Sequence, residues 1–280
     1  MCRHLGRSGA QPLVATQAPI HPVRAVFISD IHLGSRGCNA DALLSFLRAV
    51  QTDTLYLVGD IVDIWSLRRG FYWPQSHNNV LRTLLGKAKH GTRVVYVPGN
   101  HDEDFREFAG MQFGNLEIAQ DCIHVTAGGE RLLVLHGDEF DSVVKCSPWL
   151  AALGSRAYDF SIDMNRHFNR VRRAFGYEYW SLANYLKHKV KNAVNYISSF
   201  EQAVAREARR RGADGVVCGH IHRAEITRID EVLYCNDGDW VESCTALVED
   251  RNGRLAIWDW SQMQGGLEPV PAVDPVGLAA

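Results

Sequence analysis

The sequence predicts an α/β fold in which strands alternate with helices and several short antiparallel strands follow near the C-terminus. Five strand-like segments each end in residues that bind metals, and two segments between them have the apolar spacing of amphipathic helices. Strands that alternate with helices usually form a largely parallel sheet, so the five strand ends should meet at one edge. The sequence therefore places a candidate metal site at that edge.

The five predicted strands are short and mostly apolar. They are RAVFIS (24–29), TLYLV (54–58), RVVYVP (93–98), RLLVL (131–135) and DGVVC (214–218). The residues that follow them supply carboxylates, imidazoles and one amide. These candidate ligands are Asp30, His32, Asp60, Asn100, His136, His220 and His222. Such a mixed oxygen and nitrogen set suits Mn²⁺, Fe²⁺ or Zn²⁺ rather than Ca²⁺ or a thiolate zinc site, which predicts a catalytic and dinuclear centre.

Two helices and four further strands complete the predicted core. Residues 40–50 have apolar side chains at helical spacing after Asn39, a candidate cap, and residues 78–89 form a second helix that ends at Gly91. Four segments near the C-terminus alternate with turns and predict antiparallel hairpin strands. They are residues 224–230, 232–239, 244–250 and 255–260.

Composition sets wider limits on the class of protein. The chain has 280 residues, of which 46% are hydrophobic, and a net charge of −2, so nothing global indicates a nucleic-acid or membrane partner. Seven scattered cysteines without a CxxC pair favour a reducing compartment, and no apolar run is long enough to span a membrane. We expect residues 1–22 and 262–280 to be flexible tails.

About eighty residues separate His136 from Gly219, more than a crossover needs. We expect a core of residues 23–140 and 198–261, a crossover helix at about 198–211, and a helical cap at 141–197 beside the site. Residues 145–211 carry thirteen Lys or Arg, five Asp or Glu and interleaved aromatic residues. This pattern fits a small helical subdomain, an apolar groove rimmed by cations for an anionic amphiphile or membrane face, or a nucleic-acid surface.

The motifs D-x-H, G-D, G-N-H-D, H-G and G-H-x-H, in this order after strands, resemble those of the calcineurin-like metallophosphoesterases. The resemblance implies a four-layer αββα sandwich with an inserted helical cap and two divalent ions, with Mn²⁺ expected and Fe²⁺ or Zn²⁺ accepted by the same ligands. One ion would be held by Asp30, His32, Asp60 and His222. The other would be held by Asp60, Asn100, His136 and His220.

The chemistry implied is hydrolysis by a metal-activated hydroxide. Two cations about 3.5–4 Å apart clamp a phosphoryl group and lower the pKa of a bridging water, so no protein nucleophile is needed. The resemblance implies that His101 contacts the phosphate or protonates the leaving oxygen. Asp102 would orient His101 or a neighbouring ligand, with Asp63 and Asp138 as further supporting residues. Asn100, Arg36 and Arg223 are the candidate substrate-binding residues.

Within that superfamily the chain most resembles bacterial UDP-2,3-diacylglucosamine pyrophosphatases, which act in lipid A synthesis. The segments that carry this are FISDIHLGSR, LVGDIVDIW, YVPGNHDEDF, VLHGDEFD and CGHIHRAEI. The resemblance implies cleavage of the phosphoanhydride of a UDP-linked diacyl sugar by a cytoplasmic enzyme. It also implies peripheral contact with the inner membrane through the cap, and no nucleic-acid partner.

Two departures from that subfamily leave the substrate open. The best-known members have arginine where this chain has His101, and a Cys-Thr-Asp-Asp-like stretch where it reads Glu139-Phe140-Asp141. The alternatives are a phosphodiesterase or nuclease of the same superfamily and a non-catalytic protein-binding scaffold. The sequence gives no oligomeric state.

Overall fold

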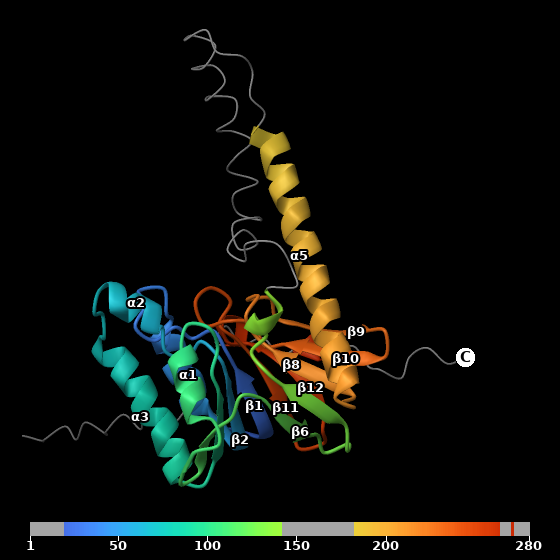
Figure 1. Cartoon of the computed structure of the whole chain (residues 1–280). Coiled ribbons are helices and arrows are strands. Elements are labelled where there is room, and N and C mark those ends of the chain that lie inside the picture. Colours follow the sequence, from blue (N-terminus) through green and yellow to red (C-terminus); the bar gives the residue numbers. More distant parts are fainter. Residues whose placement is uncertain (1–19, 142–181, 264–269, 272–280) are drawn as a thin grey trace, which may run out of the picture.

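The computed structural model describes residues 20–141, 182–263 and 270–271, so most of both predicted tails lies outside the described residues. Its centre is a pair of β-sheets with helices on their outer faces (Figure 1). The strands of the first sheet are β1 (His21–Ile28), β2 (Val50–Val58), β3 (Arg93–Val97), β4 (Gln112–Phe113), β5 (Leu116–Ile118), β11 (Thr245–Glu249), β12 (Leu255–Asp259) and β13 (Val270–Pro271). Those of the second are β6 (Cys122–Val125), β7 (Arg131–Val134), β8 (Gly215–Cys218), β9 (Glu225–Ile229) and β10 (Val232–Asn236).

The first sheet has the order β13-β12-β11-β1-β2-β3-β5-β4 and the second β6-β7-β8-β10-β9. The five predicted ligand-bearing strands are β1, β2, β3, β7 and β8, and the first three pair in parallel, as do β7 and β8. The four predicted C-terminal strands are β9 to β12, and they divide between the two sheets. Two residues of the predicted C-terminal tail form β13 and pair with β12.

The four-layer sandwich follows from the alternation of side chains along each strand. In β1, Val26 and Ile28 pack toward α1 (Ala40–Ala49) and α3 (Gln75–Lys89), whereas Ala25 and Phe27 pack against the second sheet. The outer face of the second sheet is covered by α5 (Leu182–Arg210). The layers are therefore helix, sheet, sheet and helix, and the α/β prediction is confirmed.

The two predicted helices of the first layer are present. α1 buries Leu43, Phe46 and Leu47, and α3 begins at Gln75, three residues before its predicted start, and is followed by Gly91 in a left-handed conformation. Asn39 occupies the N-cap position of α1, but its side chain makes no capping bond. Its side-chain amide nitrogen instead donates to Cys244 Sγ at 3.2 Å, so Asn39 holds the predicted N-cap position without a capping bond.

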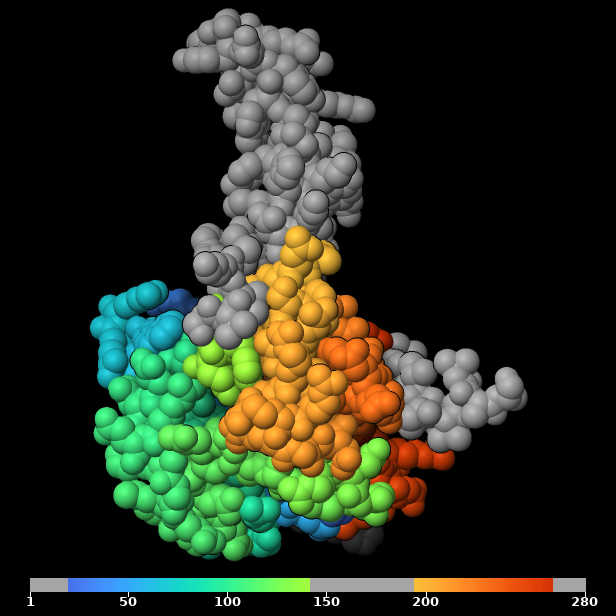
Figure 2. Space-filling view, turned by 45° about the vertical axis from the view of Figure 1, so that its right-hand side comes forward, coloured from blue at the N-terminus to red at the C-terminus, as the bar shows by residue number. Residues whose placement is uncertain are grey.

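Helix α5 is longer than the predicted crossover helix. It is continuous across residue 198, which was expected to separate cap from core, and its C-terminal half packs on β8 and β10 through Phe200, Val204 and Ala208 (Figures 1 and 2). The predicted cap spans residues 141–197, and its segment 142–181 lies outside the described residues. Among the described helices, none has both the length and the apolar character that crossing a membrane requires.

The remaining helical segments are short and lie next to the strand ends. They are α2 (Ile64–Arg69), α6 (Trp260–Met263) and the 3₁₀ turns η1 (Glu103–Phe108) and η2 (Asp138–Phe140). α2 was not predicted, because a helix of six residues has too few turns to show a periodic apolar pattern. It follows β2 directly and so lies at the edge where the candidate ligands gather (Figure 1).

Candidate metal centre

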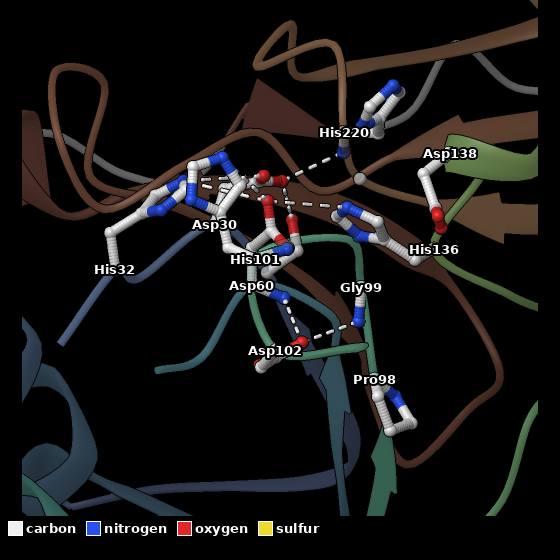
Figure 3. Close-up of polar contacts among 12 residues, drawn as sticks. Asp30, His32, Asp60, Pro98, Gly99, His101, Asp102, His136, Asp138 and His220 are labelled. Carbon is white, nitrogen blue, oxygen red and sulfur yellow. Dashed lines mark hydrogen bonds and ion pairs between the residues drawn. The ribbon is translucent and has the colours of Figure 1, made fainter. Parts of the chain in front are cut away.

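Asp30, His32, Asp60 and His136, from separate strand ends, point into one space at the edge of the sheets, whereas the His220 ring lies to one side of it (Figure 3). Three overlapping groups have donor atoms within 4.8 Å of one another. They are Asp30–His32–His222, His32–Asp60–His101 and Asp30–Asp60–His136. Asp30, His32 and Asp60 each belong to two of these groups, so the three groups form one continuous cluster of donor atoms. The arrangement can hold metal ions.

Buried polar atoms without partners mark the same space. Asp30 Oδ1, Asn100 Oδ1 and His136 Nε2 are buried and make no hydrogen bond. His222 Nε2 lies 3.0 Å from Asp30 Oδ1, and Asp60 Oδ2 lies 3.6 Å from His136 Nε2, but neither contact has hydrogen-bond geometry. Leaving such an atom unpaired costs about 1–3 kcal/mol. A carboxylate oxygen, an amide oxygen and an imidazole nitrogen together fit the donor set of divalent transition metals.

The tautomer of His136 is fixed by the backbone. Its Nδ1 donates to the carbonyl oxygen of Val58 at 2.8 Å, so Nε2 is the nitrogen that faces Asp60 and can bind an ion once it is deprotonated. Histidines that bind metals usually donate their second ring nitrogen in this way, which holds the ring in place and makes the ligating nitrogen more basic. The ring is therefore ready to bind an ion before one arrives.

Five of the candidate ligands adopt left-handed backbone conformations. The described non-glycine residues with positive φ are Asp30, His32, Asp60, His220, His222, Asp230 and Cys244. Positive φ is uncommon outside glycine and costs free energy that the surrounding packing must offset. The first five follow directly on the ends of β1, β2 and β8, where a left-handed residue turns the chain sharply and brings its side chain back over the sheet edge.

Glycines precede several ligands because there is no room for a side chain. A Cβ on Gly99 would lie 2.3 Å from Asp60 Oδ1, and one on Gly59 would lie 2.2 Å from His136 Nδ1. A Cβ on Gly219 would lie 2.6 Å from Asp30 Oδ2. The glycines of the G-D, G-N-H-D and G-H-x-H motifs thus let ligands from one strand end pack against the backbone of another.

The charges at the centre are strongly coupled. Burial alone would raise the pKa of Asp30, but the nearby imidazoles, chiefly His222, outweigh it and hold that pKa well below the usual range. Burial likewise opposes protonation of His136, yet Asp60 and Asp30 raise its pKa well above the ordinary value. Without an ion, protonated imidazoles offset the negative charge of the carboxylates. Bound divalent cations would offset that negative charge instead.

Asp102 holds two motif loops together and does not orient His101. Its carboxylate is fully buried and accepts from the amides of Ile61 at 2.7 Å and Gly99 at 2.6 Å, and from the Tyr96 hydroxyl at 2.6 Å. Asp60 N also donates to it, at 3.3 Å (Figure 3). The expectation that Asp102 orients a neighbouring ligand fits these contacts, and none of them reaches the His101 side chain.

Asp63 takes the role expected of Asp102. Its Oδ1 lies 3.0 Å from His101 Nδ1, and its carboxylate also caps α2 through the amide of Ser66. The Trp65 ring lies over His101, with centroids 4.3 Å apart. His101 Nε2 therefore faces the metal centre, 4.0 Å from Asp60 Oδ2. Burial disfavours its protonation, but Asp63 and Asp60 outweigh this and raise the pKa of His101.

Comparison with known families decides the class of protein. The family model for calcineurin-like phosphoesterases matches residues 23–224, which include every candidate ligand. The chain belongs to this family.

Two relatives of this phosphoesterase cover most of its length. A UDP-2,3-diacylglucosamine hydrolase of Neisseria meningitidis serogroup B is 26% identical over 257 residues, which are 83% of this chain and 97% of the relative. One of Pseudomonas aeruginosa is 27% identical over 248 residues, 81% of this chain and 95% of the relative. Among solved structures, the phosphoesterase Yfce of E. coli aligns with 89% of this chain and 97% of its own, with a TM-score of 0.47 and 16% identity.

The arginines predicted to bind substrate differ in how far they are engaged. The Arg36 guanidinium lies over the Tyr72 ring, 4.5 Å from its centroid. Arg223 lies 3.2 Å from Glu201 and 3.0 Å from Glu225, so its charge is compensated within the phosphoesterase. Arg36 is thus the better placed of the two to bind an anionic group.

The sequence did not predict the two residues, Ser29 and Asp237, that support the Asp30 side chain. Ser29 Oγ lies 2.7 Å from Asp30 Oδ2 and 2.6 Å from Asp237 Oδ1. Burial raises the pKa of Asp237 well above its ordinary value. The available signal was the run N-D-G-D after β10, since β10 is parallel to β8 and ends at the same edge. Sequence patterns did not show that this run reaches β1.

The structure also places the two remaining candidates, Asp138 and His220. Asp138 points away from the ligands and accepts from Arg106 Nη2 at 2.6 Å. No described hydrogen bond joins Asp138 to a candidate metal ligand, so its expected supporting role stays a prediction. The His220 ring lies beside that of His136, with centroids 5.1 Å apart, and its backbone amide donates to Asp30 Oδ2 at 2.9 Å.

Proposed function

We propose that this phosphoesterase is a dinuclear metal hydrolase that cleaves the phosphoanhydride of a UDP-linked lipid sugar of the UDP-2,3-diacylglucosamine type. The observation that carries the metal centre is the set of buried atoms on Asp30, Asn100 and His136 that make no hydrogen bond, two of which belong to residues grouped with Asp60. The substrate class is supported by the two relatives, whose alignments span 97% and 95% of their own lengths.

The proposed centre has two sites that share Asp60. The ligands of the first are Asp30, His32, Asp60 and His222. Those of the second are Asp60, Asn100, His136 and His220. We propose Mn²⁺ as the native ion, because mixed carboxylate, amide and imidazole donors suit it, although Fe²⁺ and Zn²⁺ accept the same set. When bound, the two ions would lower the pKa of a water and offset charge on the phosphate oxygens.

The chain's own residues bind and orient the diphosphate. His101 Nε2 faces the centre from a ring whose Nδ1 is held by Asp63, so it can donate to a phosphate oxygen. Arg36, kept near Tyr72, offers a planar fork for a second phosphate. Asn100 supplies a neutral oxygen and leaves the site more electropositive than a carboxylate would.

The proposed setting is the cytoplasmic side of the inner membrane, with peripheral contact. A substrate with two acyl chains stays in the bilayer, so its diphosphate must be reached at the lipid surface. The predicted cap at 141–197, rich in basic and aromatic residues, is the segment we propose for this contact. The described residues support neither a membrane nor a nucleic-acid surface by themselves.

A second candidate function is hydrolysis of a phosphodiester. The observation that favours it is the pair formed by His101 and Asp63, placed beside the metal centre. An alkoxide leaving group needs a proton, which such a histidine can donate, whereas a phosphate leaving group departs without one. A non-catalytic scaffold is less consistent with the site, because every candidate ligand is present in the sequence.

The deciding experiment compares two substrates on the purified, Mn²⁺-loaded protein. UDP-2,3-diacylglucosamine tests the lipid diphosphate, and bis-p-nitrophenyl phosphate tests the diester. Asn100→Ala removes one ligand, and Asn252→Ala, in the exposed turn after β11, is the matched control. We expect fast UMP release from the lipid by the wild type and by Asn252→Ala, and its loss in Asn100→Ala.

The other outcomes separate the alternatives. Diester cleavage without lipid turnover would support the phosphodiesterase and reject the lipid substrate. Failure on both substrates together with the absence of bound metal would reject the enzyme and favour the scaffold. Turnover of the lipid that survives Asn100→Ala would reject the proposed ligand set.

A further inference from the structure

Asp141 contacts a candidate metal ligand that lies far from it in the sequence. Its Oδ1 lies 2.8 Å from His220 Nε2. The hydroxyl of Tyr196, on α5, donates to the same carboxylate oxygen at 2.6 Å. The His220 side chain is only 5% exposed, whereas that of Asp141 is 40% exposed. An aspartate and a tyrosine thus hold the outer side of a buried imidazole.

The contact determines which nitrogen of His220 can bind an ion. An ionised carboxylate only accepts hydrogen bonds, so Nε2 carries the proton and Nδ1 keeps its lone pair. The ring is also fixed by Phe200, whose centroid lies 5.8 Å away, and by the bond from its own amide to Asp30. With Nε2 engaged by Asp141, Nδ1 is the only nitrogen of His220 left to ligate.

The imidazole of His136 is also oriented by a hydrogen bond to one of its ring nitrogens. Its Nδ1 donates to the Val58 carbonyl, which leaves Nε2 for the metal. The two neighbouring imidazoles are therefore fixed from outside in opposite tautomers, one by a backbone carbonyl and one by a carboxylate. A carboxylate in this position raises the basicity of the ligating nitrogen more than a neutral carbonyl does.

We propose that Asp141, held by Tyr196, is a positioning residue that sets the tautomer and orientation of His220 for the second metal site. The inference rests on the proposed function, because it takes His220 as a ligand. It assigns a role to the sequence Glu139-Phe140-Asp141, where the chain departs from the enzymes it resembles. Asp138, the aspartate of the H-G-D motif, does not have this role because it pairs with Arg106.

The test measures metal binding separately from activity. Isothermal titration with Mn²⁺ on the metal-free protein gives the affinity of each site, and Co²⁺ absorption reports the ligand geometry. The variants are Asp141→Ala, Asp141→Asn and Tyr196→Phe. The control is Asp121→Asn, which removes a carboxylate paired with Arg211 away from the centre.

We expect Asp141→Ala to weaken one of the two sites by about 10–100-fold and leave the other unchanged. Asp141→Asn should weaken it less, because an amide oxygen can still accept from Nε2, and Tyr196→Phe least. The Co²⁺ spectrum should change in Asp141→Ala, and excess Mn²⁺ should restore turnover of bis-p-nitrophenyl phosphate. The Asp121→Asn control should match the wild type throughout.

Two results would overturn the proposal in distinguishable ways. Two normal sites in the wild type and in every Asp141 variant would reject the role of Asp141 and leave the proposed function standing. A wild type that binds no second ion would reject the dinuclear centre and this inference together. Equal weakening of both sites in Asp141→Ala, but not in Tyr196→Phe, would indicate general loss of structure and also count against positioning.

Discussion

Two buried polar clusters lie between strands of this molecule, and they differ in how completely their atoms are paired. One is the metal centre, where Asp30, Asn100 and His136 keep partnerless atoms. The other joins the two sheets through Glu249 on β11 and His124 on β6. Both contain buried carboxylates and imidazoles, so composition alone does not separate them.

The inter-sheet cluster is fully satisfied. Glu249 accepts from Arg24 Nη1 at 2.7 and 2.9 Å, from the Ala127 amide at 2.7 Å and from His124 Nε2 at 2.7 Å. The second nitrogen of His124 lies 2.9 Å from the Tyr56 hydroxyl. None of these residues has positive φ. Complete pairing on relaxed backbone indicates a structural cluster, whereas unpaired buried atoms beside residues with left-handed backbone indicate a site for a ligand.

The largest expected effect comes from Asp60→Asn, which removes a carboxylate of the metal centre and leaves the inter-sheet cluster unchanged. Loss of the shared carboxylate should reduce turnover by about 10³-fold, equivalent to about 4 kcal/mol of barrier. The unfolding free energy of the metal-free protein should fall by less than about 1 kcal/mol, because the lost attraction to His136 is partly offset by the lost repulsion from Asp30. Steady-state kinetics and urea denaturation check the two halves. A loss of stability as large as that of a core mutation would contradict the comparison.

Gly99→Ala tests whether close approach, and not only ligand chemistry, builds the centre. The new Cβ would lie 2.3 Å from Asp60 Oδ1, so the carboxylate must move and activity should fall by about 100-fold. Gly86→Ala is the matched control, because no atom lies within 4 Å of its added Cβ in the middle of α3. The control should keep full activity and gain about 0.5–1 kcal/mol of stability. Equal activity in both variants would exclude the steric account.

Glu249→Gln should have the opposite profile to Asp60→Asn. Removing the charge weakens the bonds from Arg24 and His124 and should cost about 2 kcal/mol of unfolding free energy at pH 7. Mn²⁺ affinity and turnover should stay within about twofold of the wild type. Exposed Glu231→Gln serves as the control for urea denaturation. Loss of metal binding in Glu249→Gln would show that the two clusters are coupled.

The smallest expected effect is the pH dependence of the difference in unfolding free energy between the wild type and Glu249→Gln. Burial would raise the pKa of Glu249, but His124, the Ala127 amide and Arg24 outweigh it and hold the pKa below the ordinary 4.5. A lowered pKa contributes stability that is complete above pH 4.5 and is lost as the pH falls through the folded-state value. The stability difference between wild type and Glu249→Gln should therefore shrink below pH 4.5. A difference that is constant from pH 7 to pH 3 would contradict the lowered pKa.

The strands and their order toward the site could be predicted because local patterns determine them. Apolar runs such as TLYLV and DGVVC are long enough to show, and each ends in a motif residue. The hairpin β4–β5 could not be predicted in the same way, because its strands are two and three residues long, and β6 was missed because no motif residue follows it. The expected division between cap and core at residue 198 falls inside α5, because a continuous helical pattern gives no sign of where a subdomain begins.

Within the site, the candidate ligands could be named from motifs, but their supporting residues could not. The contact between Asp141 and His220 joins residues 79 positions apart, and that between Ser29 and Asp237 joins residues 208 apart. The sequence left open whether Asp102 orients His101 or another ligand, and in the structure its carboxylate is directed at backbone amides of residues 60–62. Such partners depend on the packing of loops against each other, which spacing along one strand does not encode.

The left-handed backbone at five candidate ligands has a consequence for engineering. Each such residue costs up to about 1–2 kcal/mol relative to ordinary backbone. Together the five approach the entire net stability of a typical domain, about 5–15 kcal/mol. Glycine at Asp60 would relieve the backbone strain but would remove the carboxylate that accepts from the His101 amide, so relief of strain and retention of the centre exclude each other. A thermostable form should be sought in the turns and helix surfaces, with these five positions held constant.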